Sequence, residues 1–375
     1  MSRQEAPERM NRRTAQADNI TMSGGGLYSL ATKGAKDVID RATPRVLAAL
    51  EQVDVASGEH WSFSDMGCAD GGTSLDLWRA VCGAVRERSA SDIQIVYADQ
   101  ARNDFNALVR IVHGLTEFDS YLDEFDGVHA LESGSSFYSP VLPAGSLHLG
   151  FSATAMHWLS RKPCDIGEHV HMVGASGEEL AAFAEQARAD WRRILSHRAR
   201  ELKPGARLVL VNFCRDEAGR HLGNTGGVDM FGEFDRIWRS FIDDGTITGE
   251  EYRAMTLPQY YNSPEEFAAP FENGTNEMSS AGLVLESLET AVVSCPFAED
   301  FKRHGDAARF AKEYIPTIRS WNESIYFGAL SSTRPEQERR EIIESFYDTY
   351  RAGVERDPER HAMDYVHAYM TIAKR

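Results

Sequence analysis

The chain lacks the cysteine content that stabilises small secreted proteins or builds zinc sites. Only five of its 375 residues are cysteines, and no two form a CxxC pair. They are Cys68, Cys82, Cys164, Cys214 and Cys295. An odd number of widely spaced cysteines argues against a disulfide framework and predicts reduced thiols. The first residues are polar and contain no apolar core of a signal peptide. We therefore expect a cytoplasmic protein with a polar arm over residues 1–20.

Long apolar runs and clusters of basic residues are also missing. No apolar run approaches the ~20 residues that a membrane-spanning helix needs. Lys and Arg number 40 against 57 Asp and Glu, which gives a formal net charge of −17. Such a balance disfavours binding to the phosphates of a nucleic acid, which requires clustered Lys and Arg side chains. The chain also lacks the Pro-Pro pair of nucleic-acid amino-methyltransferases. We expect neither a membrane nor a nucleic acid as a partner.

What the chain does contain is an alternation of strand-like and helix-like patterns. Short apolar runs predict strands, and amphipathic stretches between them predict helices. The expected strands are 60–67, 93–99, 146–154, 206–214, 282–293 and 364–374, and the expected helices are 73–90, 103–115 and 178–205. Gly205 is expected to end the last of these helices. The alternation predicts an α/β fold, a mainly parallel sheet with helices on both faces.

The alternation breaks down between Cys214 and Ser280. This segment is rich in turn residues and aromatics and is too long for a plain connection. We expect a helical cap over residues 215–274, inserted into a core of residues 21–214 and 275–375. Within it, "NSPEE" predicts a helix start, with Ser263 as N-cap and Glu266 three residues later.

A glycine-rich turn, "DMGCADGG", follows the first predicted strand. In an open parallel sheet, ligands bind at the carboxyl ends of the strands. The turn lacks the G-x-G-x-x-G spacing that holds a pyrophosphate, so it suits a nucleoside cofactor without phosphates, such as S-adenosylmethionine. Asp99 ends the second strand, where a carboxylate can accept hydrogen bonds from ribose hydroxyls. Taken alone, the glycines fit an ordinary tight turn as well as a cofactor site, and Asp99 fits a helix N-cap as well as a ribose contact. Taken together, they favour a cofactor site.

Five stretches carry a resemblance to a known family. They are "MSGGGLY" (22–28), "SDMGCADGGTS" (64–74), "ADQARNDFNAL" (98–108), "GSSFYSPVLPAGSLHLGFSATAMHWLS" (134–160) and "LPQYYNSPEE" (257–266). In this order they resemble the motifs of the SABATH family of S-adenosylmethionine-dependent methyltransferases. The resemblance implies a Rossmann-like class I methyltransferase fold with a seven-stranded sheet, S-adenosylmethionine as cofactor, and a homodimer.

The resemblance also implies roles for individual residues. The residues implied to bind the cofactor are Tyr28, Asp65, Gly67, Cys68, Thr73, Asp99, Gln100, Ser136 and Phe137. The residues implied to line the substrate pocket are Thr154, Met156, His157 and Trp158, with the Trp158 indole N–H reaching a substrate carboxylate. Thr73 and Gln100 stand where the cofactor motifs of the family have an asparagine and a leucine. In the pocket, Ala35 stands where the family has a glutamine, and Thr154 where it has a tyrosine. These departures indicate a roomier or differently shaped pocket.

The expected activity is methylation of a small, largely apolar carboxylic acid to its methyl ester. A carboxylate with a pKa of ~4–5 is already ionised at neutral pH, so no dedicated acid or base is expected. For a phenol, His157 is the candidate base. Two alternatives stay open: N-methylation of a purine or similar ring, and a non-catalytic cofactor-binding module. No metal is expected, because the Cys, Glu and His residues of 164–171 fit no tetrahedral spacing.

Overall fold

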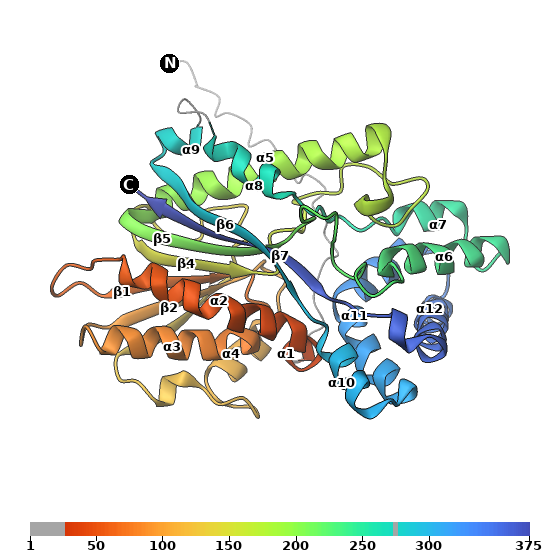
Figure 1. Ribbon diagram of the computed structural model, residues 1–375, viewed down its shortest axis with the longest axis horizontal. Helices are drawn as coiled ribbons and strands as arrows, with labels where there is room; N and C mark the ends of the chain where they lie inside the picture. Colours follow the sequence, from red (N-terminus) through yellow and green to blue (C-terminus); the bar gives the residue numbers. More distant parts are fainter. Residues whose placement is uncertain (1–26, 273–276) are drawn as a thin grey trace, which may run out of the picture.

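The computed structural model describes residues 27–272 and 277–375, and the expected arm over residues 1–20 lies outside them. Its centre is a seven-stranded sheet with the order β3-β2-β1-β4-β5-β7-β6 (Figure 1). The strands are β1 (Trp61–Met66), β2 (Ile93–Ala98), β3 (Val128–Ser133), β4 (Leu147–Ala153), β5 (Leu202–Phe213), β6 (Leu283–Val293) and β7 (Tyr365–Lys374). Strands β1 to β5 pair in parallel, whereas β7 runs antiparallel to both β5 and β6. The predicted α/β fold with a mainly parallel sheet is confirmed.

Helices cover both faces of the sheet (Figure 1). One face carries α2 (Lys33–Glu51), α3 (Leu75–Arg86) and α4 (Phe105–Val112). The other carries α5 (Gly177–Glu201), α8 (Pro264–Ala268) and α9 (Glu277–Ser280). Every residue of β1 is buried, because a strand in the middle of such a sheet meets helices on both sides.

A second group of helices lies beyond one end of the sheet, on the right of Figure 1. It contains α6 (Met230–Asp243), α7 (Gly249–Ala254), α11 (Ala307–Ala329) and α12 (Glu336–Arg356). Its core is aromatic: the rings of Trp238 and Phe346 stack with centroids 4.4 Å apart. We call these four helices the helical layer. The layer contains α6 and α7 from the expected cap together with α11 and α12 from residues 307–356. The division of the chain into core and cap stays a prediction.

Two further short helices each precede a long helix. Helix α1 (Leu27–Ala31) precedes α2, and α10 (Pro296–His304) precedes α11. The hydroxyl of Thr317 in α11 donates to the carbonyl of Ala31, so the end of α1 is fastened to the helical layer.

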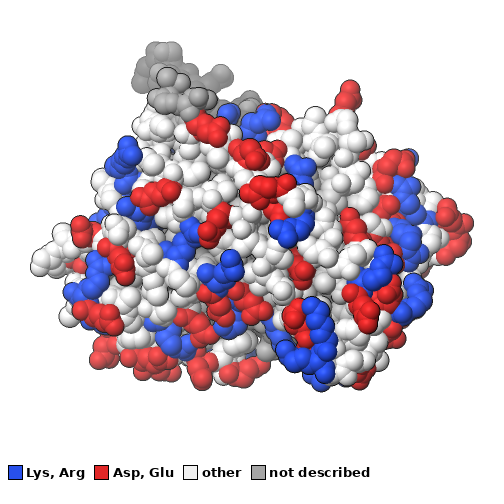
Figure 2. All heavy atoms as spheres, viewed as in Figure 1, with Lys and Arg blue, Asp and Glu red and all other residues white. Residues whose placement is uncertain are grey.

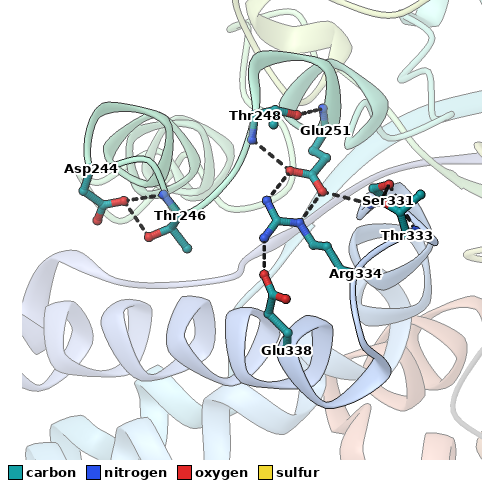
Figure 3. Close-up of polar contacts among 8 residues, drawn as sticks. All are labelled: Asp244, Thr246, Thr248, Glu251, Ser331, Thr333, Arg334 and Glu338. Atoms are coloured by element: carbon teal, nitrogen blue, oxygen red, sulfur yellow. Dashed lines mark hydrogen bonds and ion pairs between the residues drawn. The ribbon is translucent and has the colours of Figure 1, made fainter.

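A buried carboxylate joins α7 to the connection between α11 and α12 (Figure 3). Glu251 is 4% exposed, and its oxygens accept hydrogen bonds from Nε and Nη2 of Arg334 at 2.6 and 2.8 Å. They also accept from the amides of Thr248 at 2.8 Å and Ser331 at 2.9 Å. The bonds from Arg334 hold the pKa of Glu251 down, to about 2. A charge-assisted network of this kind fixes the helices of the layer relative to one another.

Two local expectations had different outcomes. The helix start at Ser263 is confirmed, since its hydroxyl and the Glu266 side chain form a complete capping box at α8. The expectation that Gly205 ends the preceding long helix is wrong, because α5 stops at Glu201. Leu202 is already extended and pairs with Leu147 of β4, so strand pairing ends the helix, and Gly205 lies inside β5 with a φ of +84°.

Acidic and basic side chains are interspersed over the face shown in Figure 2. Although the chain has a net charge of −17, its acidic residues do not form a separate patch on that face; basic residues lie among them. Within residues 27–272 and 277–375, no helix is both long and apolar enough to cross a membrane.

Candidate active site

The glycine turn lies at the carboxyl end of β1, as the sequence predicts. Gly67 and Gly71 both have a φ of +76°, a backbone conformation that glycine adopts without cost. A Cβ on Gly67 would lie 2.3 Å from the Cβ of Ala155, so the turn packs directly against the loop that follows β4. The Asp70 carboxylate accepts a hydrogen bond from the amide of Ser29 at 3.0 Å, which fastens the turn to α1. The turn is thus held from two sides.

Asp65, at the end of β1, supports this turn from beneath. Its Oδ2 accepts hydrogen bonds from the hydroxyl of Ser74 at 2.6 Å and from Nε1 of Trp78 at 3.0 Å. Burial raises the pKa of Asp65 to about 6, although these two bonds oppose the shift. Both bonds lead to the start of α3, so Asp65 sets the path from strand to helix.

Asp99, at the tip of β2, faces the same turn. Its Oδ2 accepts from the amide of Ala69 at 2.9 Å and its Oδ1 from the amide of Gln100 at 2.7 Å. Burial raises its pKa, and the two backbone bonds oppose that shift. The N-cap of α4 is Asp104, which accepts from the amide of Ala107, so the alternative reading of Asp99 as that cap is wrong. Each Asp99 oxygen keeps a further lone pair for a ligand hydroxyl.

A cavity of about 450 Å³ opens between these elements. That volume lies within the ~300–1,000 Å³ typical of small-molecule sites. Predicted site residues in its lining are Tyr28, Gly67, Asp99, Gln100, Ser136, Phe137, Thr154 and Trp158. They come from segments as far apart in sequence as Tyr28 and Trp158, and the carboxyl edge of the sheet brings them together.

The loop that carries Phe137 is held by an ion pair inside the protein. Arg198 of α5 donates to the carbonyls of Phe137 and Ser139, both at 3.0 Å. The guanidinium also pairs with Glu201 at 2.7 Å, and the two side chains are 0% and 2% exposed. Glu201 in turn accepts from the amide of Val141 at 2.7 Å. This fully bonded pair fixes the position of the aromatic ring over the cavity.

A second, smaller cavity of about 40 Å³ adjoins the first. Tyr28, Thr154 and Trp158 line both, so the two spaces meet at these side chains. The remaining wall is largely apolar and aromatic; it includes Ala35, His157, Phe213, Leu222, Trp321, Met363 and Tyr365. Small residues at positions 35 and 154 do not open a large space, because Trp321 of α11 and Tyr365 of β7 fill much of the wall.

His157 is an uncharged member of this wall. Its ring lies 4.8 Å from that of Phe213 and 5.4 Å from that of Trp158, measured between centroids. Burial lowers the pKa of His157 to about 3, so the imidazole is neutral at physiological pH. Thr154, three residues earlier, has a φ of +55°, a strained conformation for a β-branched residue. Strain of this kind is found where a loop is held for function.

The structure leaves four predicted residues outside the lining of both cavities. Asp65 supports the turn as described above, and Cys68 is buried in the core, where burial raises the pKa of its thiol. Thr73 faces a separate surface hollow beside α2 and α3. Met156 belongs to the apolar cluster that also contains Trp191. Their side chains support the site from behind rather than face the two cavities.

The described part of the chain contains no group of three or more His, Cys, Asp or Glu residues arranged to hold a metal ion. Two histidines of the 164–171 stretch are engaged in packing. His171 stacks on Phe231 with ring centroids 3.9 Å apart, and Nδ1 of His169 lies 2.9 Å from the carbonyl of His171.

Comparison with known proteins decides the family. A family model described as "SAM dependent carboxyl methyltransferase" matches residues 18–375. The chain belongs to this family. The SABATH resemblance is therefore confirmed.

Individual relatives of the chain are distant. Indole-3-acetate O-methyltransferase 1 of Oryza sativa subsp. japonica is 27% identical over 241 residues, which cover 56% of this chain and 59% of that enzyme, less than two thirds of its length. Gibberellic acid methyltransferase 1 of Arabidopsis thaliana is 25% identical, over 73% of this chain and 77% of that enzyme. A solved structure of loganic acid methyltransferase with SAH superimposes with a TM-score of 0.70 at 19% identity, covering 94% of this chain and 98% of the other. This last likeness concerns the fold.

The larger cavity suits S-adenosylmethionine, the methyl donor named in the description of the family. Gly67 and Ala155 both line this cavity, and Gly67 presents only backbone to it, because a Cβ there would collide with Ala155. Asp99 presents a carboxylate edge for the ribose hydroxyls, and the ring of Phe137 offers a surface for the adenine. The chemistry of the lining therefore fits the cofactor.

Several supporting residues were not found from the sequence. Arg198 and Glu201 lie in a helix whose pattern shows only amphipathicity, and Trp321 and Tyr365 lie in segments far from every motif. Gln259 lies inside the stretch 257–266 that carries the resemblance, but the resemblance implies no role for it. No local pattern identifies these residues, because their place at the site depends on how distant elements pack.

Proposed function

We propose that this methyltransferase converts a small, largely apolar carboxylic acid to its methyl ester. The observation that supports this proposal is the meeting of the two cavities at Trp158. A methyl donor in the larger cavity and an acceptor in the smaller one would approach each other there. Trp158 combines one N–H donor with a large apolar face, which suits a carboxylate attached to a hydrophobic body.

S-adenosylmethionine, when bound, supplies an electrophilic methyl group on a sulfonium. The chain's own contribution is to orient the acceptor and to exclude water from it, and these effects can lower a barrier by several kcal/mol. The apolar wall of Phe213, Leu222 and Met363 provides that exclusion. Orientation falls to the polar groups beside Trp158.

His157 is poorly suited to remove a proton. Its pKa of about 3 lies far below that of a phenol, so transfer of a phenolic proton to this imidazole is strongly unfavourable. A carboxylic acid, in contrast, has lost its proton before it binds. The neutral histidine therefore supports an acid as acceptor over a phenol and a shape-determining role for His157.

The test is a panel of acceptors with labelled S-adenosylmethionine. It contains indole-3-acetic, loganic, gibberellic and farnesoic acids, simple aromatic and fatty acids, phenols and xanthines. We expect a methyl ester from at least one acid, and loss of kcat/KM with that acid in Trp158→Phe. Methylation of a ring nitrogen with no acid turned over would instead establish the N-methyltransferase alternative.

We also propose that the segment over residues 215–274, together with α11 and α12, shields the acceptor. Gln259 and Tyr261 of this segment and Trp321 of α11 line the smaller cavity. Hydrogen exchange should show greater protection of the segment with S-adenosylhomocysteine and acid together than with neither. Equal protection in both states would make it a static subdomain.

The cytoplasmic location and the homodimer belong to the same proposal. Reduced cysteines support the first, and the family resemblance supports the second. Light scattering on the purified chain measures the oligomeric state directly. Fractionation of the source cells locates the protein.

A further inference from the structure

Gln259 lies directly opposite Trp158. The segment after β4 and the segment before α8 form an isolated antiparallel bridge between these two residues. The amide of Leu159 donates to the carbonyl of Pro258 at 2.8 Å, and the amide of Tyr260 donates to the carbonyl of His157 at 2.9 Å. These bonds flank the pair, which makes it a non-hydrogen-bonded pair, the arrangement in which opposing side chains lie closest.

Both side chains of this pair face the smaller cavity. Trp158 and Gln259 are part of its lining, and Gln259 is only 1% exposed. A primary amide carried so deep into an aromatic wall is costly unless its polar atoms are bonded. The position therefore calls for a hydrogen-bond partner at each end of the amide.

The oxygen end of the amide is already engaged by the protein. The hydroxyl of Tyr261 donates to Oε1 of Gln259 at 3.2 Å. The imidazole of His171 interacts with the same side chain: burial lowers the pKa of His171 well below its usual value, and Gln259 opposes that shift. Because the oxygen is held there, the amide nitrogen points away from Tyr261.

No hydrogen bond joins Nε2 of Gln259 to an acceptor among residues 27–272 and 277–375, and the same holds for Nε1 of Trp158. Two N–H donors without a protein acceptor thus sit side by side at the cavity. A carboxylate accepts hydrogen bonds at both of its oxygens, so it can bond to both donors at once. Ala35 of α2, in the same lining, offers only a methyl group.

We infer that Gln259 is the second binding group for the acceptor's carboxylate and that, together with Trp158, it selects carboxylic acids as substrates. Nε2 of Gln259 bonds to one carboxylate oxygen and Nε1 of Trp158 to the other. The pair fixes the plane of the carboxylate while leaving a lone pair of one oxygen directed toward the larger cavity. This inference rests on the proposed function.

The experiment compares the acid with its neutral ester. Binding of the best acid from the panel and of its methyl ester is measured by calorimetry, with S-adenosylhomocysteine present, for the wild type and Gln259→Leu. Leucine keeps much of the volume and removes both donors. We expect the acid to bind about 10- to 100-fold more weakly, the effect of a lost bond to a charged group, and the ester to lose less than about 3-fold.

A second variant separates binding from damage to the fold. Ala35→Gln in the Gln259→Leu background returns an amide to the same cavity from α2, and we expect it to recover at least about 5-fold in acid affinity. Gln259→Glu, which adds a negative charge, should raise KM for the acid more than Gln259→Leu does. Unchanged S-adenosylhomocysteine affinity in all variants shows that the larger cavity is intact.

Two results would overturn the inference. One is equal loss of acid and ester, which indicates a merely structural role for Gln259. The other is a Gln259→Leu enzyme with wild-type KM for the acid. In both cases the wild type still methylates acids, and the proposed function stands. If the wild type methylates a ring nitrogen and no acid, the proposed function fails first, and the role of Gln259 with it.

Discussion

Replacing His157 with glutamine tests both the neutrality of this histidine and the absence of a catalytic base. The folded protein holds the pKa of His157 at about 3, whereas an unfolded chain has a histidine pKa near 6.5. Between pH 6.5 and about pH 3, the histidine is therefore protonated in the unfolded state and neutral in the folded state. The stability that His157 contributes is complete above pH 6.5 and is lost as pH falls toward 3.

The size of the effect follows from these two values. At pH 5 the unfolded chain gains about 2 kcal/mol from protonation of this one side chain, while the folded protein gains almost nothing. His171 and His367, whose pKa values are lowered mainly by burial, remain in the variant, so subtracting its curve from the wild-type curve isolates His157. We expect His157→Gln to be less sensitive to acid than the wild type by about 2 kcal/mol between pH 7 and pH 5.

Urea unfolding followed by tryptophan fluorescence at pH 7, 6 and 5 measures the free energies. His129→Gln, at an exposed position of β3, is the control for removing an imidazole at the surface. Turnover of an acid should be nearly flat from pH 6 to 9, and His157→Gln should retain much of the maximal rate. Parallel stability curves would refute the neutral-histidine argument. Abolished turnover with intact binding of both ligands would refute the base-free reaction.

Three further variants test the cofactor site and the fold. Asp99→Ala should weaken S-adenosylhomocysteine binding by about 1–3 kcal/mol in calorimetry, and unchanged affinity in a folded variant would remove Asp99 from the ribose site. Gly71→Ala should destabilise the protein by about 1–2 kcal/mol more than Gly58→Ala. Both glycines have a positive φ, but only at Gly71 would the new Cβ lie 2.7 Å from a leucine side chain of α4. Equal losses for the two would mean that packing around the turn adjusts freely. Arg334→Met should lower the free energy of unfolding in urea by about 1–3 kcal/mol, because buried Glu251 loses its charged partner. Arg340→Met, which removes only an exposed ion pair with Glu336, should lower it by less than about 0.5 kcal/mol.

Much of the site could be predicted because its signals are local. The glycine turn must follow a strand, and the acid must end the next one, so both can be recognised within ten residues of sequence. Strand β3 shows the opposite case. It lies at the edge of the sheet and is half exposed, so Val128–Ser133 lacks the apolar run that marked the other strands. Gly205 was misjudged because pairing with β4 ended the helix earlier than its own sequence indicates.

The sequence by itself determined the alternation of elements, the glycine turn, Asp99 and the Trp158 stretch, because each depends on residues a few positions apart. Only the tertiary structure decided what lines the smaller cavity. Strand β7 inserts antiparallel between β5 and β6, and this brings Tyr365 to the carboxyl edge of the sheet. The bridge between two segments a hundred residues apart sets Gln259 against Trp158. Such neighbours follow from the order of strands and the packing of helices, which no short stretch of sequence specifies.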